Sequence, residues 1–305
     1  MPVLNQRELT FLTRIVECTK LNEFWLTGST TYRGTAQKIG IQFPRSDYDL
    51  VIKGDRLVYQ QCLKSLKDLG FQILYDRPFY CKFNLVHQLV MIRAECKFDI
   101  AIVPDFDFKV FGHFNFECIF WHFPSGSILD PFNGLDFMLK RRLIPIIRSN
   151  QENPYLFIGR LTKLCSRFQI DVNQDKVLSK LARELAEIVH IWSPPNEFHS
   201  KYARESCIGS IARSILGASD RCAFIDQFNR VGILNAVFNG INPEDLSCER
   251  INSAETIGDI LSTFESSISN PKARHEFRAR VQLPKKKLRE KLEPCITAFQ
   301  SMIFN

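Results

Sequence analysis

The period of the apolar residues changes near the middle of the chain, and this change constrains the fold more than any other feature. Strand-like runs occur only in the first half, at 24–26, 47–52, 71–75, 82–87, 89–92 and 98–103. Helical i, i+3, i+4 spacing marks 9–18, 55–69, the residues from about 153, and then 173–190, 221–231, 254–268 and 285–303. We therefore expect an α+β fold. A mixed sheet with flanking helices would occupy residues 1–148, and an all-α half would occupy residues 149–305.

Composition excludes several classes of protein. A chain of 305 residues that is 45% hydrophobic and 24% charged is neither disordered, collagen-like nor a coiled coil. No apolar run approaches the roughly 18 residues that span a bilayer, and the first ten residues do not resemble a secretory signal. The ten cysteines contain no C-x-x-C pair, so we expect reduced core thiols and no structural metal. Together these features predict a soluble, cytoplasmic protein without a membrane partner.

The positive charge is local. Residues 272–291 contain nine Lys or Arg and two Glu, and therefore carry the whole formal net charge of +7. A helix face with this density of charge favours contact with RNA phosphates, which releases counterions. The alternative is a solvated helix face. The expected RNA-binding residues are Arg278, Arg280, Lys285, Lys286, Lys287 and Arg289.

A Gly-Ser turn follows the first strand-like run. The segment Trp25 to Gly34 carries Gly28 and Ser29 directly after the apolar residues. Such a turn exposes backbone N–H groups and a small hydroxyl, which suit the oxygens of a triphosphate. A Gly-Ser pair is also common in loops, so the turn alone indicates little.

Acidic residues on two predicted strands strengthen this interpretation. Asp47 and Asp49 are two residues apart, and alternation in a strand places them on one face. Asp99 lies within an apolar run, where a carboxylate needs a partner or a cation. Three acids on two strands fit a two-metal site for phosphoryl transfer, with Mg²⁺ as the cation. Otherwise, Asp47 is a turn residue, Asp49 a surface acid and Asp99 a solvated edge residue.

The order of these motifs resembles that of the nucleotidyltransferase superfamily. Ile128 to Leu135, with the sequence ILDPFNGL, is similar to the IIDPFGGL of class II CCA-adding tRNA nucleotidyltransferases and bacterial poly(A) polymerases. Glu152-Asn153-Pro154 is similar to that family's EDP, and 168–171 to its GFxID. The resemblance covers about residues 20–175 and implies a nucleotidyltransferase-type sheet. It also implies that Asp47 and Asp49 bind the catalytic metals. Asp99, which the strand pattern indicates, is the candidate third acid that activates or orients the attacking hydroxyl.

The resemblance also suggests residues that contact the nucleotide. Gly28, Ser29 and Arg33 match the glycine turn and the arginine that follows it, with one extra residue before the arginine. Asn153 stands where the family has a base-reading Asp, and Leu156 stands where it has Arg. The family's RRDFTINA falls on 111–118 and has lost both arginines and its acid. Selection of CTP or ATP by an Asp–Arg pair is therefore not expected.

Helical residues after Asn153 offer further candidates. Arg160 and Lys163 are three apart on one helix face and can meet the triphosphate, although a solvated basic face explains them equally well. Tyr155 and Phe157 either stack on a base or pack as helix core. His113 and His122 fit packed or surface histidines better than acid–base catalysts.

These features predict a Mg²⁺-dependent nucleotidyltransferase that adds nucleotides from an NTP to an acceptor and releases pyrophosphate. The resemblance implies the 3′ end of an RNA as acceptor, in tRNA-end extension or polyadenylation. One alternative is transfer of a nucleotide, such as AMP, to a protein or a small molecule. A second alternative is a catalytically decayed RNA-binding protein.

Neutralising Lys285, Lys286 and Lys287 should weaken RNA binding and reduce its salt dependence, because fewer phosphate contacts release fewer counterions. The measurement is RNA affinity by fluorescence anisotropy at several salt concentrations. Unchanged affinity and slope would show that the basic segment is only solvated surface.

Overall fold

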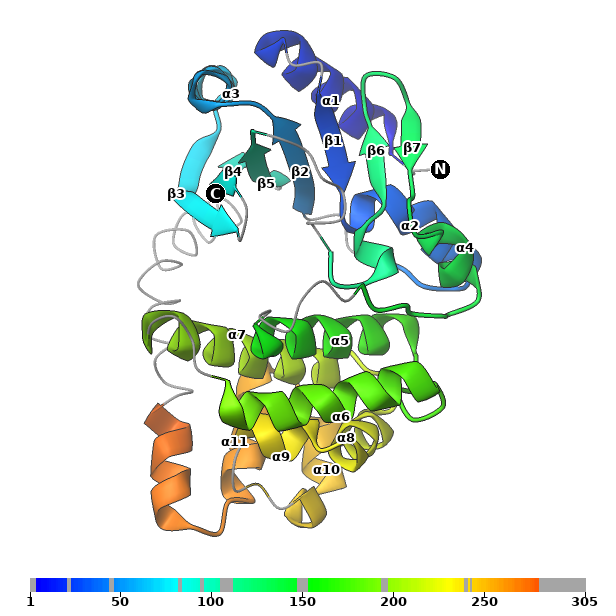
Figure 1. Cartoon of the computed structure of the whole chain (residues 1–305), viewed down its shortest axis with the longest axis vertical. Helices are drawn as coiled ribbons and strands as arrows, with labels where there is room; N and C mark the ends of the chain where they lie inside the picture. The colour runs from blue at the N-terminus through cyan, green and yellow to red at the C-terminus, as the bar shows by residue number, and fades with distance from the viewer. Residues whose placement is uncertain are drawn as a thin grey trace, which may run out of the picture. The chain divides into compact units, whose positions relative to one another are not determined.

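The chain forms two compact units, Met1–Ile147 and Arg148–Asn305 (Figure 1). This computed structural model describes residues 4–20, 23–43, 47–81, 84–93, 96–104, 112–146, 153–192, 197–238, 241 and 243–279. The protein is α+β, with a mixed sheet flanked by helices in the first unit and helices in the second. The predicted fold class is confirmed.

The first unit contains five antiparallel strand pairs and one parallel pair among its described residues. The sheet order is β3-β4-β5-β2-β1-β6-β7, and β2 and β5 form the parallel pair. The elements are α1 (Gln6–Thr19), β1 (Phe24–Thr27), α2 (Ser29–Lys38), β2 (Asp47–Lys53), α3 (Arg56–Asp68), β3 (Gln72–Cys81), β4 (Asn84–Arg93), β5 (Cys96–Val103), η2 (Asn115–Glu117), β6 (Phe120–His122), β7 (Ser127–Leu129) and α4 (Gly134–Leu139).

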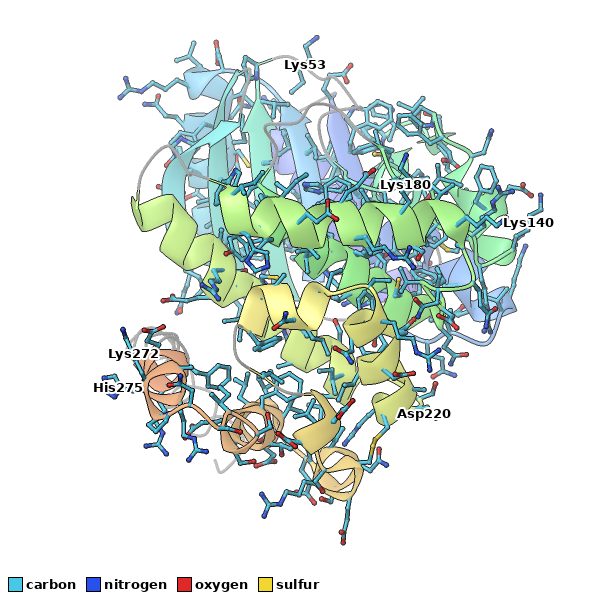
Figure 2. All side chains as sticks on the ribbon, turned by 60° about the horizontal axis from the view of Figure 1, so that its bottom comes forward. Lys53, Lys140, Lys180, Asp220, Lys272 and His275 are labelled. Atoms are coloured by element: carbon cyan, nitrogen blue, oxygen red, sulfur yellow. A yellow bond between two sulfur atoms is a disulfide. The ribbon has the colours of Figure 1, made fainter. Side chains whose placement is uncertain are left out.

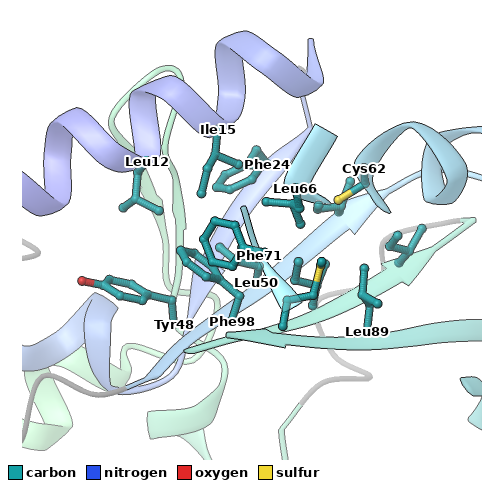
Figure 3. Close-up of a cluster of buried hydrophobic side chains, with 14 of the residues drawn as sticks. Leu12, Ile15, Phe24, Tyr48, Leu50, Cys62, Leu66, Phe71, Leu89 and Phe98 are labelled. Carbon is teal, nitrogen blue, oxygen red and sulfur yellow. The ribbon is translucent and has the colours of Figure 1, made fainter. Parts of the chain in front are cut away.

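One face of this sheet is covered by α1 and α3. Alternate residues of the central strands, such as Tyr48, Leu50 and Phe98, are buried there against Leu12 and other residues of the two helices (Figure 3). The Tyr48 and Phe98 rings stack with centroids 5.0 Å apart. Period-two alternation therefore directs the intervening residues of β2 and β5 to the opposite face.

The opposite face carries a smaller apolar cluster. Val51 of β2, Val103 of β5, and Cys118 and Phe120 are buried in it. Ala101 packs against this cluster from β5. Acidic residues on this face of the sheet thus have apolar neighbours along their own strands.

Five elements of the first unit have no counterpart in the prediction, namely α2, η2, β6, β7 and α4. The segment STTYRGTAQK forms α2 directly after Gly28, where only a turn was expected. This polar segment shows no helical period of apolar residues, so the sequence does not indicate the helix. The helix is stabilised by packing against α4, β1 and β2. The strands β6 and β7 are each only three residues long, too short for a period to show.

The second unit is helical throughout its described elements. Those elements are α5 (Pro154–Phe168), α6 (Lys176–Ile191), α7 (Glu197–Leu216), α8 (Arg221–Arg230), α9 (Ile233–Phe238), η3 (Pro243–Asp245), α10 (Cys248–Ser253), α11 (Ile257–Ser266) and a last helix at 271–279. Helix α5 packs against α6 and α7, and α8 to α11 pack among themselves and against these helices (Figure 1). The predicted helix at 285–303 lies outside the described residues.

A disulfide joins Cys222 at the start of α8 to Cys248 at the start of α10, near Asp220 in Figure 2. The expectation that the cysteines are reduced is wrong for this pair. Arg221 donates hydrogen bonds from Nη1 to the carbonyls of Ile251 and Ala254 at 2.9 and 2.7 Å, and so brings the two helices together. The two cysteines are 26 residues apart, so no short spacing motif marks them in the sequence.

Within the described residues, no helix is both long and apolar enough to cross a membrane.

Replacing Phe98 by alanine should lower the free energy of unfolding by about 3–5 kcal/mol, because it leaves a cavity beneath three aromatic rings. Leu57→Ala is the control, since Leu57 is 71% exposed on α3, and it should change stability by less than about 0.5 kcal/mol. Urea denaturation measures both. Equal effects of the two substitutions would contradict the assigned core.

Candidate active site

Asp49 and Asp99 occupy neighbouring positions of the sheet. They are paired in register across the parallel strands β2 and β5, which places both on the face opposite α1 and α3. Both are half-buried. Two carboxylates on adjacent strands of one face are close enough to repel each other, unless a cation or a donor compensates their charge.

Gly28 lies directly against Asp49. Strand β1 ends at Thr27, which pairs with Asp49 across the antiparallel β1–β2 ladder. Gly28 then takes φ +67° and ψ −154°, a backbone conformation that residues other than glycine rarely adopt. A Cβ at this position would lie 2.2 Å from Asp49 Oδ2. Glycine is therefore required for the carboxylate to approach the turn this closely.

Helix α2 begins at Ser29, immediately after this turn. Its N-cap is Gly28, which has no side chain and so makes no side-chain cap hydrogen bond. Thr31 Oγ1 donates to the Gly28 carbonyl at 2.7 Å and fixes the turn. The N-terminal end of a helix carries partial positive charge and binds anions. The turn thus places an anion-binding helix end beside a carboxylate.

The structure therefore brings four predicted site residues together, namely Gly28, Ser29, Asp49 and Asp99. Asp47 lies two residues before Asp49 on β2, in register with Lys97 of β5. Its side chain is outside the described part of the structure. Among the described side chains, no group of three or more His, Cys, Asp or Glu could hold a metal ion.

Gln88 is a member of this site that the sequence did not indicate. Its Nε2 donates a hydrogen bond to Asp99 Oδ1 at 2.9 Å. Gln88 lies on β4, opposite Ala101 of β5. The contact between Gln88 and Asp99 arises from the pairing of β4 with β5. The sequence around Gln88 does not distinguish it from a surface residue, so sequence analysis could not indicate this contact.

Arg33 does not take the predicted place at a nucleotide. It is 1% exposed, and its Nη1 lies 3.5 Å from Glu8 Oε1, which also accepts a hydrogen bond from the Tyr48 hydroxyl at 2.7 Å. This buried network joins α1, α2 and β2. A contact of Arg33 with a bound nucleotide would require this buried side chain to leave the network.

Asn153, Arg160 and Lys163 belong to the second unit. Asn153 caps α5 by accepting a hydrogen bond at Oδ1 from the Tyr155 backbone N–H at 3.0 Å. Arg160 is exposed and Lys163 half-buried on one face of the helix. A contact of these residues with a nucleotide stays a prediction.

Tyr155 is 6% and Phe157 4% exposed, so both belong to the core of the second unit. The Tyr155 ring lies edge-on to Trp192, with centroids 6.0 Å apart. Of the two interpretations of these aromatics, packing as helix core is the one that the structure supports.

The segment Ile128 to Leu135 has a structural role, because it forms the turn that precedes α4. Asp130 accepts hydrogen bonds from the backbone N–H groups of Gly134 and Leu135 at 2.6 and 2.9 Å, and so starts α4. A Cβ on Gly134 would lie 2.5 Å from the Asn115 carbonyl oxygen. This motif therefore holds α4 against the loop before β6.

His113 and His122 make local contacts. The His113 backbone N–H donates to Glu117 Oε2 at 3.0 Å. His122 Nδ1 lies 2.7 Å from Ser125 Oγ in the β6–β7 hairpin, and its ring packs on Trp25. These contacts support the interpretation of both as packed or surface histidines.

Part of the basic segment is engaged in contacts within the chain. Arg274 donates to the Ile268 carbonyl from Nε and Nη2 at 2.9 and 2.6 Å, and Arg278 pairs with Glu265. Lys272 and His275 are exposed on the same helix (Figure 2). The other predicted RNA-binding residues lie outside the described part of the chain, namely Arg280, Lys285, Lys286, Lys287 and Arg289.

The buried cysteines are poor candidates for a nucleophile. Burial raises the pKa of the Cys62 thiol to about 12. Burial also raises the pKa of Cys165 and of Cys207 far above the usual range. Only a small fraction of these thiols would be the reactive thiolate at neutral pH.

Comparison with known proteins gives no family assignment. No protein-family model matches this sequence, and none of the curated proteins compared with it shows a significant match.

Gly28→Ala should destabilise the protein more than Gly40→Ala. Both glycines have positive φ, +67° and +79°, so both substitutions carry a backbone cost, which is about 1–3 kcal/mol at Gly28 because its ψ of −154° falls in a region nearly restricted to glycine. A Cβ on Gly40 meets nothing within 4 Å, whereas one on Gly28 meets Asp49 Oδ2. We expect an additional loss of at least ~1 kcal/mol for Gly28→Ala. Urea denaturation measures the difference, and equal losses would contradict the close approach of Asp49.

Proposed function

We propose that this protein is a metal-dependent nucleotidyltransferase that resembles class II CCA-adding enzymes and bacterial poly(A) polymerases. The observation that carries this proposal is the packing of the Gly28–Ser29 turn against Asp49, in register with Asp99. A helix end that favours phosphate oxygens and carboxylates that favour a divalent cation meet at one place. Both are needed to bind a nucleoside triphosphate with its cation.

The donor set fits Mg²⁺. Asp49 and Asp99 supply carboxylate oxygens, which are the ligands that hard divalent cations prefer, and Asp47 is available on the same strand. The bound cation would neutralise charge on the transferring phosphate. It would also reduce the repulsion between the two half-buried carboxylates, which are in register on neighbouring strands.

The residues of the chain have separate tasks in this proposal. The first N–H groups of α2 and the Ser29 hydroxyl bind phosphate oxygens. Asp47, Asp49 and Asp99 would hold the cation, and Asp99 would also orient the hydroxyl that attacks the α-phosphate. The hydroxyl oxygen bonds to the α-phosphorus as the bond between that phosphorus and the pyrophosphate oxygen breaks. Pyrophosphate leaves, and the proton of the hydroxyl passes to solvent. Positioning and charge account for most of the rate in this chemistry, so no general base is required.

The proposed acceptor is the 3′ end of an RNA in the cytoplasm, by tRNA-end extension or polyadenylation. Its support is the resemblance of residues 20–175 together with the net charge of +7 carried by residues 272–291. Base selection would differ from that of the family, because Asn153 caps α5 and Leu156 is 46% exposed without any hydrogen-bonding group.

The test is an incorporation assay with the purified full chain, Mg²⁺, each labelled NTP and a set of RNAs. We expect labelled RNA, and we expect Asp47→Ala with Asp49→Ala to lower incorporation by more than ~100-fold, since these are direct ligands of the cation. Asp136→Ala is the matched control. This acid of the same unit is exposed and paired with Lys140, and its loss should leave the rate unchanged.

The same assay distinguishes the alternatives. If the label appears on a protein or on a small molecule instead of RNA, that molecule is the acceptor, and the proposed nucleotidyl transfer still holds. No incorporation from any NTP, with RNA binding retained, would reject the enzymatic proposal in favour of a decayed RNA-binding protein.

A further inference from the structure

Gln88 donates a hydrogen bond to Asp99, one of the two carboxylates of the site whose side chains the structure describes. Gln88 and Asp99 lie on neighbouring antiparallel strands and on the same face, because Gln88 pairs with Ala101 and Val90 pairs with Asp99. The side-chain amide crosses diagonally to donate its Nε2–H to Asp99 Oδ1 at 2.9 Å. Gln88, Asp99, Asp49 and Gly28 thus form a row across β4, β5, β2 and the end of β1.

Lys97 precedes Asp99 by two residues on the same face of β5, and the neighbours on the other side of this hydrogen bond are apolar. Val51 and Val103 are 2% exposed and Val90 is 9% exposed, and Ala101 packs in the same cluster as the first two. A carboxylate in such surroundings is poorly solvated, so a protein donor strongly fixes its orientation. This hydrogen bond engages Oδ1, one of the two carboxylate oxygens of Asp99, and does not involve Oδ2.

The chemical type of the donor is informative. An Arg or Lys at position 88 would orient Asp99 equally well but would also neutralise the negative charge that attracts a cation. A glutamine amide donates a hydrogen bond and adds no net charge. The hydrogen bond therefore adds no positive charge beside the two carboxylates while it restricts the movement of Asp99.

We propose that Gln88 is a positioning residue, which holds Asp99 so that its Oδ2 and the Asp49 carboxylate share one divalent cation. This inference rests on the proposed function. Partners of this kind around metal-binding carboxylates set ligand orientation, and their loss lowers metal affinity or activity about 10–100-fold.

The variants separate positioning from folding. Gln88→Met keeps the length of the side chain and removes the donor. Gln88→Asn keeps an amide but shortens it beyond reach of Asp99, and it provides a second variant if the first does not fold. Gln72→Met is the matched control, because Gln72 is an exposed glutamine on the neighbouring strand β3. Urea denaturation of each variant reports folding.

The experiment measures binding of Mn²⁺ alone to the full chain by electron paramagnetic resonance, with Asp49→Ala defining the site. We expect Gln88→Met and Gln88→Asn to weaken the Asp49-dependent binding by about 10–100-fold, and Gln72→Met to leave it unchanged. In the incorporation assay the Mg²⁺ concentration for half-maximal rate should rise by a similar factor, with a smaller change in KM for the NTP.

The outcomes distinguish this inference from the proposed function. Wild-type Mn²⁺ affinity in both folded Gln88 variants would overturn the positioning role and leave the nucleotidyltransferase intact. Absence of any Asp49-dependent Mn²⁺ binding in the wild type would overturn both, because the cation site itself would be missing.

Discussion

The close approach of the Asp49 carboxylate to the Gly28 turn is the constraint on which the rest of the site depends. It requires a residue without a side chain at position 28, because a Cβ would lie 2.2 Å from Asp49 Oδ2. It also requires that β1 end at Thr27, opposite Asp49, and that α2 begin at the next residue after the turn. A strand end, a helix start and an acid are thereby fixed together by one contact.

The opposite face of the sheet keeps this contact in register. Tyr48 and Phe98 stack beneath α1 and α3, and a shift of one residue in β2 or β5 would move these rings out of the core. The same register aligns Asp49 with Asp99. Burial of aromatic residues on one face therefore offsets the cost of holding two like charges side by side on the other, and a bound cation would reduce that cost further.

Sequence patterns predicted the α+β class, which is confirmed, and the strands that carry Asp49 and Asp99, because the alternation of apolar and polar residues depends on local geometry. They could not predict α2, whose polar sequence is helical through its packing, nor the disulfide between Cys222 and Cys248, which are joined only by the tertiary structure. Arg33 was expected at a nucleotide but pairs with Glu8, 25 residues earlier in the chain. Gln88 was missed for the same reason, because its partner is set by register between strands.

The most direct test of the central claim is a crystal structure of the full chain with Mn²⁺ and a non-hydrolysable nucleoside triphosphate. The anomalous signal of Mn²⁺ locates the cation independently of the nucleotide. The account predicts a Mn²⁺ peak bound by the carboxylates of Asp49 and Asp99, with the triphosphate on the backbone N–H groups at Gly28 and Ser29. A cation or a triphosphate bound away from these residues would contradict it.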